Sequence, residues 1–318
     1  MIKKLRVIDV SYGTTHDGPG MRTTVFVKGC PLRCKWCQNP ESIRVNNEVW
    51  WDQTKCIGCR SCLQSCSSGA LKEEENGLRI NRSICLNCGE CVNACPAGAL
   101  TRVAEEYDLQ TLMDDVLKYR TYYDQFGGGV TCSGGEPLLQ YSFIKEFFKA
   151  LHEECITTAL DTCGCVPREN LEAVLPYTDY ILYDIKLFDS KKHAYFTGSE
   201  NKIILNNLLY IAEYVRTTER PMEVWIRTPL IPGITAEEET IRDIGMFIKE
   251  NLADVVTRWE LCAFNGACVV KYRKLGEEWI YQDIKQMMQS EVDLLHNIAN
   301  ETFIKEKIIV TGMIRPDN

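Results

Sequence analysis

Residues 30–37 read CPLRCKWC, which places three cysteines in a C-x3-C-x2-C arrangement within eight residues. A structural zinc site takes four protein ligands, and an iron–sulfur cubane is normally held by four thiolates. Three thiolates so close together therefore predict a cluster in which one iron keeps an open position. We interpret Cys30, Cys34 and Cys37 as a catalytic metal centre, because an open coordination position lets a second molecule bind the metal.

Two further cysteine runs follow, and they repeat one another. Residues 55–71 read KCIGCRSCLQSCSSGAL and residues 84–100 read ICLNCGECVNACPAGAL, with matching cysteines 29 residues apart. Each run is C-x2-C-x2-C-x3-C, a bacterial ferredoxin pattern in which the fourth cysteine binds the other cluster. We therefore expect one [4Fe–4S] cluster on Cys56, Cys59, Cys62 and Cys95, and a second on Cys85, Cys88, Cys91 and Cys66. Zinc is the alternative, but zinc sites pair two C-x2-C units instead of repeating four-cysteine runs.

The other six of the 17 cysteines show no ligand spacing. Free cysteine is often a small buried hydrophobe, so we expect all six in the core. They are Cys132, Cys155, Cys163, Cys165, Cys262 and Cys268. The last four lie near expected strand ends, which leaves a role near the active site open.

Composition narrows the class of protein. The chain has 318 residues, 45% of them hydrophobic, and a net charge of −8. The negative charge argues against a nucleic-acid partner, and no apolar run is long enough to span a bilayer. The basic start, MIKKLRVIDVSYG, has no apolar segment of the kind that signal peptides need. We expect a cytoplasmic protein without a membrane partner, whose clustered cysteines are metal ligands instead of disulfides.

Outside the cysteine runs, short apolar strands alternate with amphipathic helices. Expected strands are 23–29, 129–135, 157–164, 179–188, 222–230 and 258–264. Expected helices are 109–119, 142–154, 205–215 and 238–250. This alternation predicts parallel strands joined by crossover helices.

The fold class expected is therefore α/β, with a partial (β/α)6 TIM-like barrel. Residues 1–47 and 104–318 form this barrel, and residues 48–103 form an inserted bacterial-ferredoxin-like domain. The site of such a barrel lies at the carboxyl ends of its strands, which is where the unusual residues fall, from Cys30 to the AFN stretch of 263–265.

At this point the sequence resembles a known family. CPLRCKWC resembles the C-x3-C-x2-C motif of radical S-adenosylmethionine enzymes, which have an aromatic residue before the last cysteine. The longer stretch HDGPGMRTTVFVKGCPLRCKWCQNPES, residues 16–42, is similar to the opening of glycyl radical enzyme activating enzymes. The resemblance covers nearly the whole chain and includes the ferredoxin-like insert.

The resemblance implies S-adenosylmethionine and three [4Fe–4S] clusters as cofactors. Its GGE motif corresponds to Gly134, Gly135 and Glu136, which would bind the amino group of the cofactor. Glycine allows the backbone to approach a ligand closely. A Gly-Gly-Glu-Pro turn that caps a helix is the alternative interpretation.

Further motif residues carry over in the same way. Asp184 and Lys186 of DIK point to one face of a strand, and Lys186 would pair with the cofactor carboxylate. Asp161 and Thr162 of DTCG join Asp184 in an oxygen-rich set suited to a hard cation, and some relatives hold a monovalent cation there. Arg227 matches an arginine near the cofactor. Loop caps and structural ion pairs are the alternatives.

One position departs from the family pattern. Relatives read leucine-proline-tyrosine-histidine after the last barrel strand, whereas residues 261–265 here read LCAFN. The cofactor-contacting histidine is thus replaced by Asn265, which hydrogen-bonds but cannot carry a charge.

The resemblance implies a radical oxidoreductase that activates a partner glycyl radical enzyme. Reductive cleavage of S-adenosylmethionine gives a 5′-deoxyadenosyl radical, which abstracts hydrogen from a glycine of the partner. A flavodoxin or ferredoxin type donor would supply electrons, and the insert would relay them. The alternatives are a radical enzyme acting on a small molecule, a pure electron carrier and a zinc-stabilised interaction module.

Overall fold

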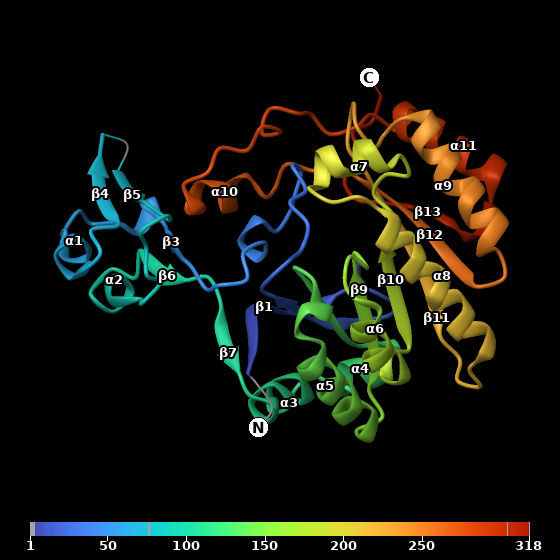
Figure 1. Ribbon diagram of the computed structural model, residues 1–318, viewed down its shortest axis with the longest axis horizontal. Helices are drawn as coiled ribbons and strands as arrows, with labels where there is room; N and C mark the ends of the chain where they lie inside the picture. The colour runs from blue at the N-terminus through green and yellow to red at the C-terminus, as the bar shows by residue number, and fades with distance from the viewer. Residues whose placement is uncertain (1–3, 76, 304, 318) are drawn as a thin grey trace.

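The computed structural model describes residues 4–75, 77–303 and 305–317, and these form a curved α/β sheet with a smaller lobe beside it (Figure 1). The sheet has nine strands in the order β13-β12-β11-β10-β9-β8-β2-β1-β7. Seven of these strands are parallel: β2 (Arg22–Val27), β8 (Gly129–Gly134), β9 (Thr157–Thr162), β10 (Tyr180–Asp184), β11 (Glu223–Leu230), β12 (Val256–Ala263) and β13 (Ile308–Thr311). Strands β1 (Leu5–Thr14) and β7 (Glu105–Tyr107) are antiparallel at one edge.

Helices cover the outer face of the sheet and enclose the main core (Figure 1). They are α3 (Leu109–Leu117), α4 (Arg120–Phe126), α5 (Tyr141–Glu153), α6 (Arg168–Val174), α8 (Lys202–Thr217), α9 (Glu238–Asn251) and α11 (Gln289–Thr302). Two further short helices, α7 (Ser190–Thr197) and α10 (Val269–Leu275), lie in loops at the carboxyl ends of strands. Within the described residues, no helix is both long and apolar enough to cross a bilayer.

The architecture agrees with an α/β partial barrel, and it has one more parallel strand than the six expected. All six expected strands and all four expected helices are present within a few residues of their expected bounds. Strand β13 and helix α11 were not anticipated, and neither was the antiparallel edge. The sheet stays open, because β13 and β7 stand at opposite ends of the strand order.

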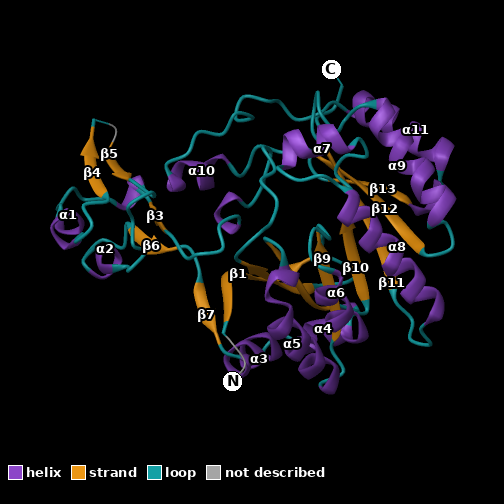
Figure 2. Cartoon of the chain, viewed as in Figure 1, coloured by secondary structure: helices purple, strands orange, loops and turns teal. Residues whose placement is uncertain are grey.

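The smaller lobe lies to one side of the barrel (Figure 2). It contains β3 (Val49–Trp51), α1 (Ser61–Ser65), β4 (Leu71–Glu74), β5 (Gly77–Ile80), α2 (Glu90–Asn93) and β6 (Leu100–Arg102). Its first and last strands pair antiparallel, with Val49 opposite Arg102, so the segment leaves and rejoins the barrel at one place. We call residues 48–103 the insert.

The carboxyl ends of β2 and β8 meet unusually closely. Gly135 donates its N–H to the carbonyl of Val27 at 2.9 Å, and Glu136 donates its N–H to the carbonyl of Gly29 at 2.7 Å. A Cβ on Gly134, which has φ +108°, would lie 2.4 Å from the nitrogen of Val27. These positions require glycine because a side chain would push the two strand ends apart.

The side chain of Glu136 connects the end of β8 to the end of β9. Its fully buried carboxylate accepts hydrogen bonds from the Thr162 hydroxyl at 2.8 Å, the Cys163 N–H at 2.8 Å and the Leu138 N–H at 3.0 Å. Burial raises the pKa of Glu136, and these donors oppose the rise. One carboxylate thus sets the position of two neighbouring loops.

We expect Glu136→Ala to lower the free energy of unfolding by about 3 kcal/mol or more, since each buried polar group left unpaired costs about 1–3 kcal/mol. Urea unfolding followed by circular dichroism measures this. Glu153→Ala, at the exposed end of α5, is the matched control and should change stability by about 0.5 kcal/mol or less. Equal effects of the two substitutions would show that the Glu136 contacts do not hold the loops.

Candidate active site

A cavity of about 280 Å³ opens at the carboxyl ends of the parallel strands. It is lined by residues from the loop after β2 and from the ends of β8, β9, β10, β11 and β12. The lining includes the three cysteines of the first motif together with acidic, basic and glycine residues: Cys30, Cys34, Cys37, Gly134, Gly135, Asp161, Thr162, Asp184, Lys186 and Arg227. The fold therefore brings together in space motif residues that are far apart in the sequence.

The alternation of side chains along parallel strands explains this convergence. Ala159, Leu182 and Trp225 form a small apolar cluster inside the barrel. The residues two positions further along the same strands are Asp161, Asp184 and Arg227, and a shift of two residues returns to the same face. The strand ends thus place polar side chains directly above an apolar floor.

Acidic and basic groups alternate around this part of the cavity. Lys186 Nζ lies 2.6 Å from an Asp184 oxygen, and Arg227 lies 3.3 Å from Asp161 and 3.4 Å from Glu260. Ser133 donates its hydroxyl to Asp161 at 2.6 Å. The Nε of Arg227 is buried and faces the Glu260 oxygen as an ion pair, outside hydrogen-bond geometry.

The protonation equilibria of these groups are shifted by their surroundings. Burial raises the pKa of Asp161 to about 6, against the effect of the Arg227 cation. Burial alone would lower the pKa of Lys186, but the negative charge of Asp184 raises it above its ordinary value. Lys186 is therefore a lasting positive charge at the cavity wall, with a side chain that is 14% exposed.

The three thiols of the first motif differ in their local environment. Burial raises the pKa of Cys34 to about 12, and it raises the pKa of Cys37 as well. A hydrogen bond from Cys163 lowers the pKa of Cys30, against the effect of burial. Buried thiols next to a lysine fit a metal cluster, because iron binding removes the thiol proton and supplies positive charge to the thiolates.

Two predicted site residues do not line this cavity. Glu136 is turned into the protein, where it holds the loop that follows β9. Asn265 accepts a hydrogen bond from the N–H of Ala267 at 3.1 Å, and its carbonyl accepts one from Gln38 at 3.1 Å. The Glu136 side chain thus holds a neighbouring loop, whereas the Asn265 side chain binds within its own loop.

The sequence analysis did not select several residues that line the cavity: Asp17, Gln38, Ser133, Cys163 and Cys262. Asp17 belongs to the HDGPG stretch and Cys163 to DTCG, so motif membership could have suggested both. Gln38 directly follows the last cysteine of the first motif, and Ser133 directly precedes the GGE motif. Cys262 had no such signal.

The expectation that six cysteines are buried in the core holds for three of them. Cys132, Cys163 and Cys268 are buried, whereas Cys165 and Cys262 are half-buried. The expectation is wrong for Cys155, which is exposed. Cys155 follows the end of α5 in the left-handed region, with φ +56°, where the chain turns at the surface.

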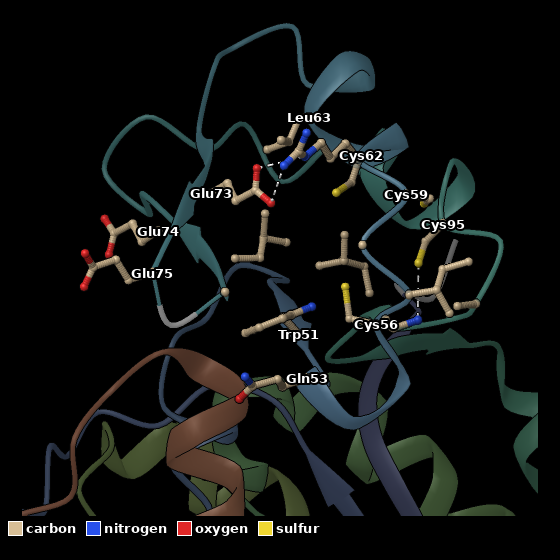
Figure 3. A pocket seen from close by; sticks show the side chains of 18 residues that line it. Trp51, Gln53, Cys56, Cys59, Cys62, Leu63, Glu73, Glu74, Glu75 and Cys95 are labelled. Atoms are coloured by element: carbon tan, nitrogen blue, oxygen red, sulfur yellow. Dashed lines mark hydrogen bonds and ion pairs between the residues drawn. The ribbon is translucent and has the colours of Figure 1, made fainter.

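The insert cysteines fall into two groups that combine both runs. A cavity of about 400 Å³ is lined by Cys56, Cys59, Cys62 and Cys95 (Figure 3). A smaller one, of about 20 Å³, is lined by Cys66, Cys85, Cys88 and Cys91. In each group the fourth cysteine comes from the other run, and what the two cavities bind stays a prediction.

Across the described residues, no three Asp, Glu, His or Cys side chains are arranged to hold a single metal ion. A cubane requires a different arrangement of cysteines, because each thiolate binds a different iron atom of the cluster. Its cysteines surround the cluster instead of converging on one atom.

Comparison with known proteins identifies the family. Residues 24–244 match the Radical SAM superfamily. The chain is 39% identical to the indoleacetate decarboxylase activating enzyme of Tractidigestivibacter scatoligenes, over 86% of this chain and 84% of that one. It is 34% identical to the trans-4-hydroxy-L-proline dehydratase activating enzyme of Clostridioides difficile, over 95% of this chain and 98% of that one.

The fold also matches a solved structure. The Streptococcus suis SuiB structure with a bound precursor peptide, SuiA, superposes with a TM-score of 0.51 at 13% identity, over 89% of this chain and 46% of that one. Similarity at this level concerns the fold alone. Together with the sequence relatives and the cavity at the strand ends, it places the chain in the radical S-adenosylmethionine superfamily, as a member of the activating enzymes of glycyl radical enzymes.

Proposed function

We propose that the cavity at the strand ends is the place where this enzyme activates its glycyl radical enzyme. The observation that carries the proposal is that Cys30, Cys34 and Cys37 open onto the same cavity as the charged set around Lys186. When bound there, a [4Fe–4S] cluster supplies the electron that cleaves S-adenosylmethionine to methionine and a 5′-deoxyadenosyl radical, which takes a hydrogen atom from a glycine of the partner.

The protein side chains bind and orient the cofactor. Lys186 is positioned to neutralise the cofactor carboxylate, because an ammonium group has three donors and Asp184 takes only one of them. Gly134 and Gly135 leave the backbone open at the wall where the charged amino group has to be held. Arg227 adds a second cation to this wall and is held there by Asp161 and Glu260.

Asp161, Thr162 and Asp184 form the oxygen-rich part of the wall. Carboxylate and hydroxyl oxygens suit hard cations, and a monovalent cation bound there would offset the two carboxylates. Glu136 supports this wall from behind, because it binds the Thr162 hydroxyl and the Cys163 N–H. Its role is to position the loop, and it does not contact the cofactor in this arrangement.

The insert is proposed to be a ferredoxin-like domain with two further [4Fe–4S] clusters. The cavity lined by Cys56, Cys59, Cys62 and Cys95 and the cavity lined by Cys66, Cys85, Cys88 and Cys91 would each hold one. Iron–sulfur potentials can be tuned over a wide range. The two clusters are therefore suited to pass electrons from a flavodoxin or ferredoxin type donor to the barrel.

The function is tested with anaerobically reconstituted enzyme, dithionite, S-adenosylmethionine and the co-purified partner. We expect methionine and 5′-deoxyadenosine to form, together with the electron paramagnetic resonance signal of a glycyl radical on the partner. The triple variant C30A/C34A/C37A should give none of these. Cofactor cleavage that produces a modified small molecule, and no radical on a protein, would refute the proposal.

Metal content gives an independent prediction. Three cubanes require about twelve irons and as many sulfides for each chain, and the triple variant should lose about a third of both. Iron and acid-labile sulfide analysis of the reconstituted protein measures this. Stoichiometric zinc with little sulfide would contradict it.

Lys186 should matter far more for cofactor binding than Asn265. Leaving one partner of a buried ion pair unmatched costs about 3–5 kcal/mol, so Lys186→Ala should weaken S-adenosylmethionine binding about a hundredfold or more, at 1.4 kcal/mol for each factor of ten. Asn265 offers neutral hydrogen bonds worth about 0.5–1.5 kcal/mol each. Asn265→Ala should therefore cost about tenfold or less, and Asn265→His should be tolerated.

Anaerobic calorimetric titration measures these affinities. Lys192→Ala is the matched control, because Lys192 pairs with Glu237 at the exposed surface of α7 and should leave the affinity unchanged. Equally small effects of Lys186→Ala and Asn265→Ala would mean that the cofactor carboxylate binds elsewhere.

A further inference from the structure

The segment after β12 forms a buried aromatic stack next to the first cysteine motif. Tyr272 and Trp279 lie 5.4 Å apart with an interplanar angle of 18°, and Phe264 and Trp279 lie 5.8 Å apart at 25°. All three rings are buried, and they share a hydrophobic cluster with Trp36. The stack is therefore a rigid support for the loop that carries the motif.

Two donors of this stack bind carbonyl groups of the motif loop. The Tyr272 hydroxyl donates to the carbonyl of Cys37 at 3.0 Å, and Trp279 Nε1 donates to the carbonyl of Lys35 at 3.2 Å. The main chain of the motif loop, including that of Cys37, is thereby tied to α10 and to the chain that follows it.

The other end of α10 is tied to the insert. Helix α10 packs against β3 and lies on the side of the barrel that faces the insert (Figures 1 and 2). The guanidinium of Arg82 donates to the carbonyl of Leu275, the last residue of α10, at 2.8 and 3.3 Å. Arg82 stands three residues before Cys85, and the Cys85 N–H donates to the carbonyl of Asn81 at 3.1 Å.

These contacts form a continuous route from the second cysteine run to the first motif. It runs along the backbone from Cys85 to Arg82, across a hydrogen bond to Leu275, along α10 to Tyr272, and across a hydrogen bond to Cys37. Electron tunnelling falls off less steeply through covalent and hydrogen bonds than across van der Waals gaps. A bonded route of this kind favours electron transfer between its ends.

The first run meets α10 through a different contact. Lys274 pairs with Asp52 at 3.1 Å, and the two side chains are 30% and 18% exposed. The larger cavity of the insert, at Cys56 and Cys59, has both of these cysteines exposed. Cys88 of the second run is exposed as well, so what distinguishes the second run is its bonded contact toward the barrel.

We propose that Tyr272 and Arg82 are positioning residues that complete the electron route from the cluster on Cys66, Cys85, Cys88 and Cys91 to the cluster on the first motif. This inference rests on the proposed function, because it requires clusters at both ends. One electron leaves a reduced insert cluster, which returns to its oxidised state, and it reduces the oxidised cluster at the barrel. A reduced flavodoxin then restores the insert, and no proton needs to move.

The test uses the full reconstituted chain with bound S-adenosylmethionine and reduced flavodoxin as the electron donor. Freeze-quench electron paramagnetic resonance follows the one cluster whose signal is altered by the cofactor. In Tyr272→Phe, which removes only the hydroxyl, this signal should appear severalfold more slowly, because a through-space gap then replaces the hydrogen bond to Cys37. Iron content and cofactor affinity should stay within twofold of the wild type.

Two control variants test whether the slower reduction is specific to the proposed route. Tyr281→Phe removes a hydroxyl from the same aromatic cluster, and Lys274→Ala removes the contact to the first run. Both should reduce the barrel cluster at the wild-type rate. Arg82→Lys, which keeps the charge but loses the forked donor geometry, should slow the reduction as Tyr272→Phe does.

A wild-type rate in Tyr272→Phe would overturn the route, whatever the rate in Lys274→Ala. A slow rate accompanied by lost iron or weakened cofactor binding would show that Tyr272 only maintains the structure. A wild-type chain with about four irons, the content of one cubane, would instead refute the insert clusters, and the route with them.

Discussion

The buried carboxylate of Glu136 is the contact on which the site depends. It accepts hydrogen bonds from groups at the ends of two strands, and its own backbone N–H binds the residue before Cys30. Two glycines make this close approach possible because a Cβ at either position would meet backbone atoms. The side chain of the GGE motif therefore holds the loop of the first cysteine motif in line with the acidic wall.

The charges of the cavity wall form a nearly balanced set. Lys186 and Arg227 face Asp161, Asp184 and Glu260 within 4 Å. Unpaired buried charges are costly, and each of these groups is held by an opposite neighbour. A ligand with both an amino and a carboxylate group can exchange with these partners without leaving a net charge buried, which suits the methionine end of S-adenosylmethionine.

The sequence predicted the parallel strands well because each is a short apolar run that is followed by an unusual motif. It did not predict β1, whose side chains are mostly half-buried or exposed, or β13, which has four residues after a largely polar helix. Motif matching selected most of the residues that line the cavity, but it could not predict the direction in which each side chain points. Glu136 belongs to the expected motif but binds the loop after β9, and that depends on contacts with residues distant in the sequence.

Buried ion pairs hold the insert against the barrel, so the insert is not attached through a flexible linker alone. Lys28, which follows β2, is fully buried, and its ammonium group lies 3.1 Å from Glu48, where the insert begins. Glu48 also pairs with Arg82 at 3.0 Å, and burial lowers the pKa of Lys28 against the effect of Glu48. Moving the insert away would leave Lys28 buried without its carboxylate, at a cost of about 3–5 kcal/mol. These ion pairs hold the start of the insert against the barrel, and they also keep Arg82 against α10. The buried charge of Lys28 therefore helps to fix the distance between the insert and the first cysteine motif.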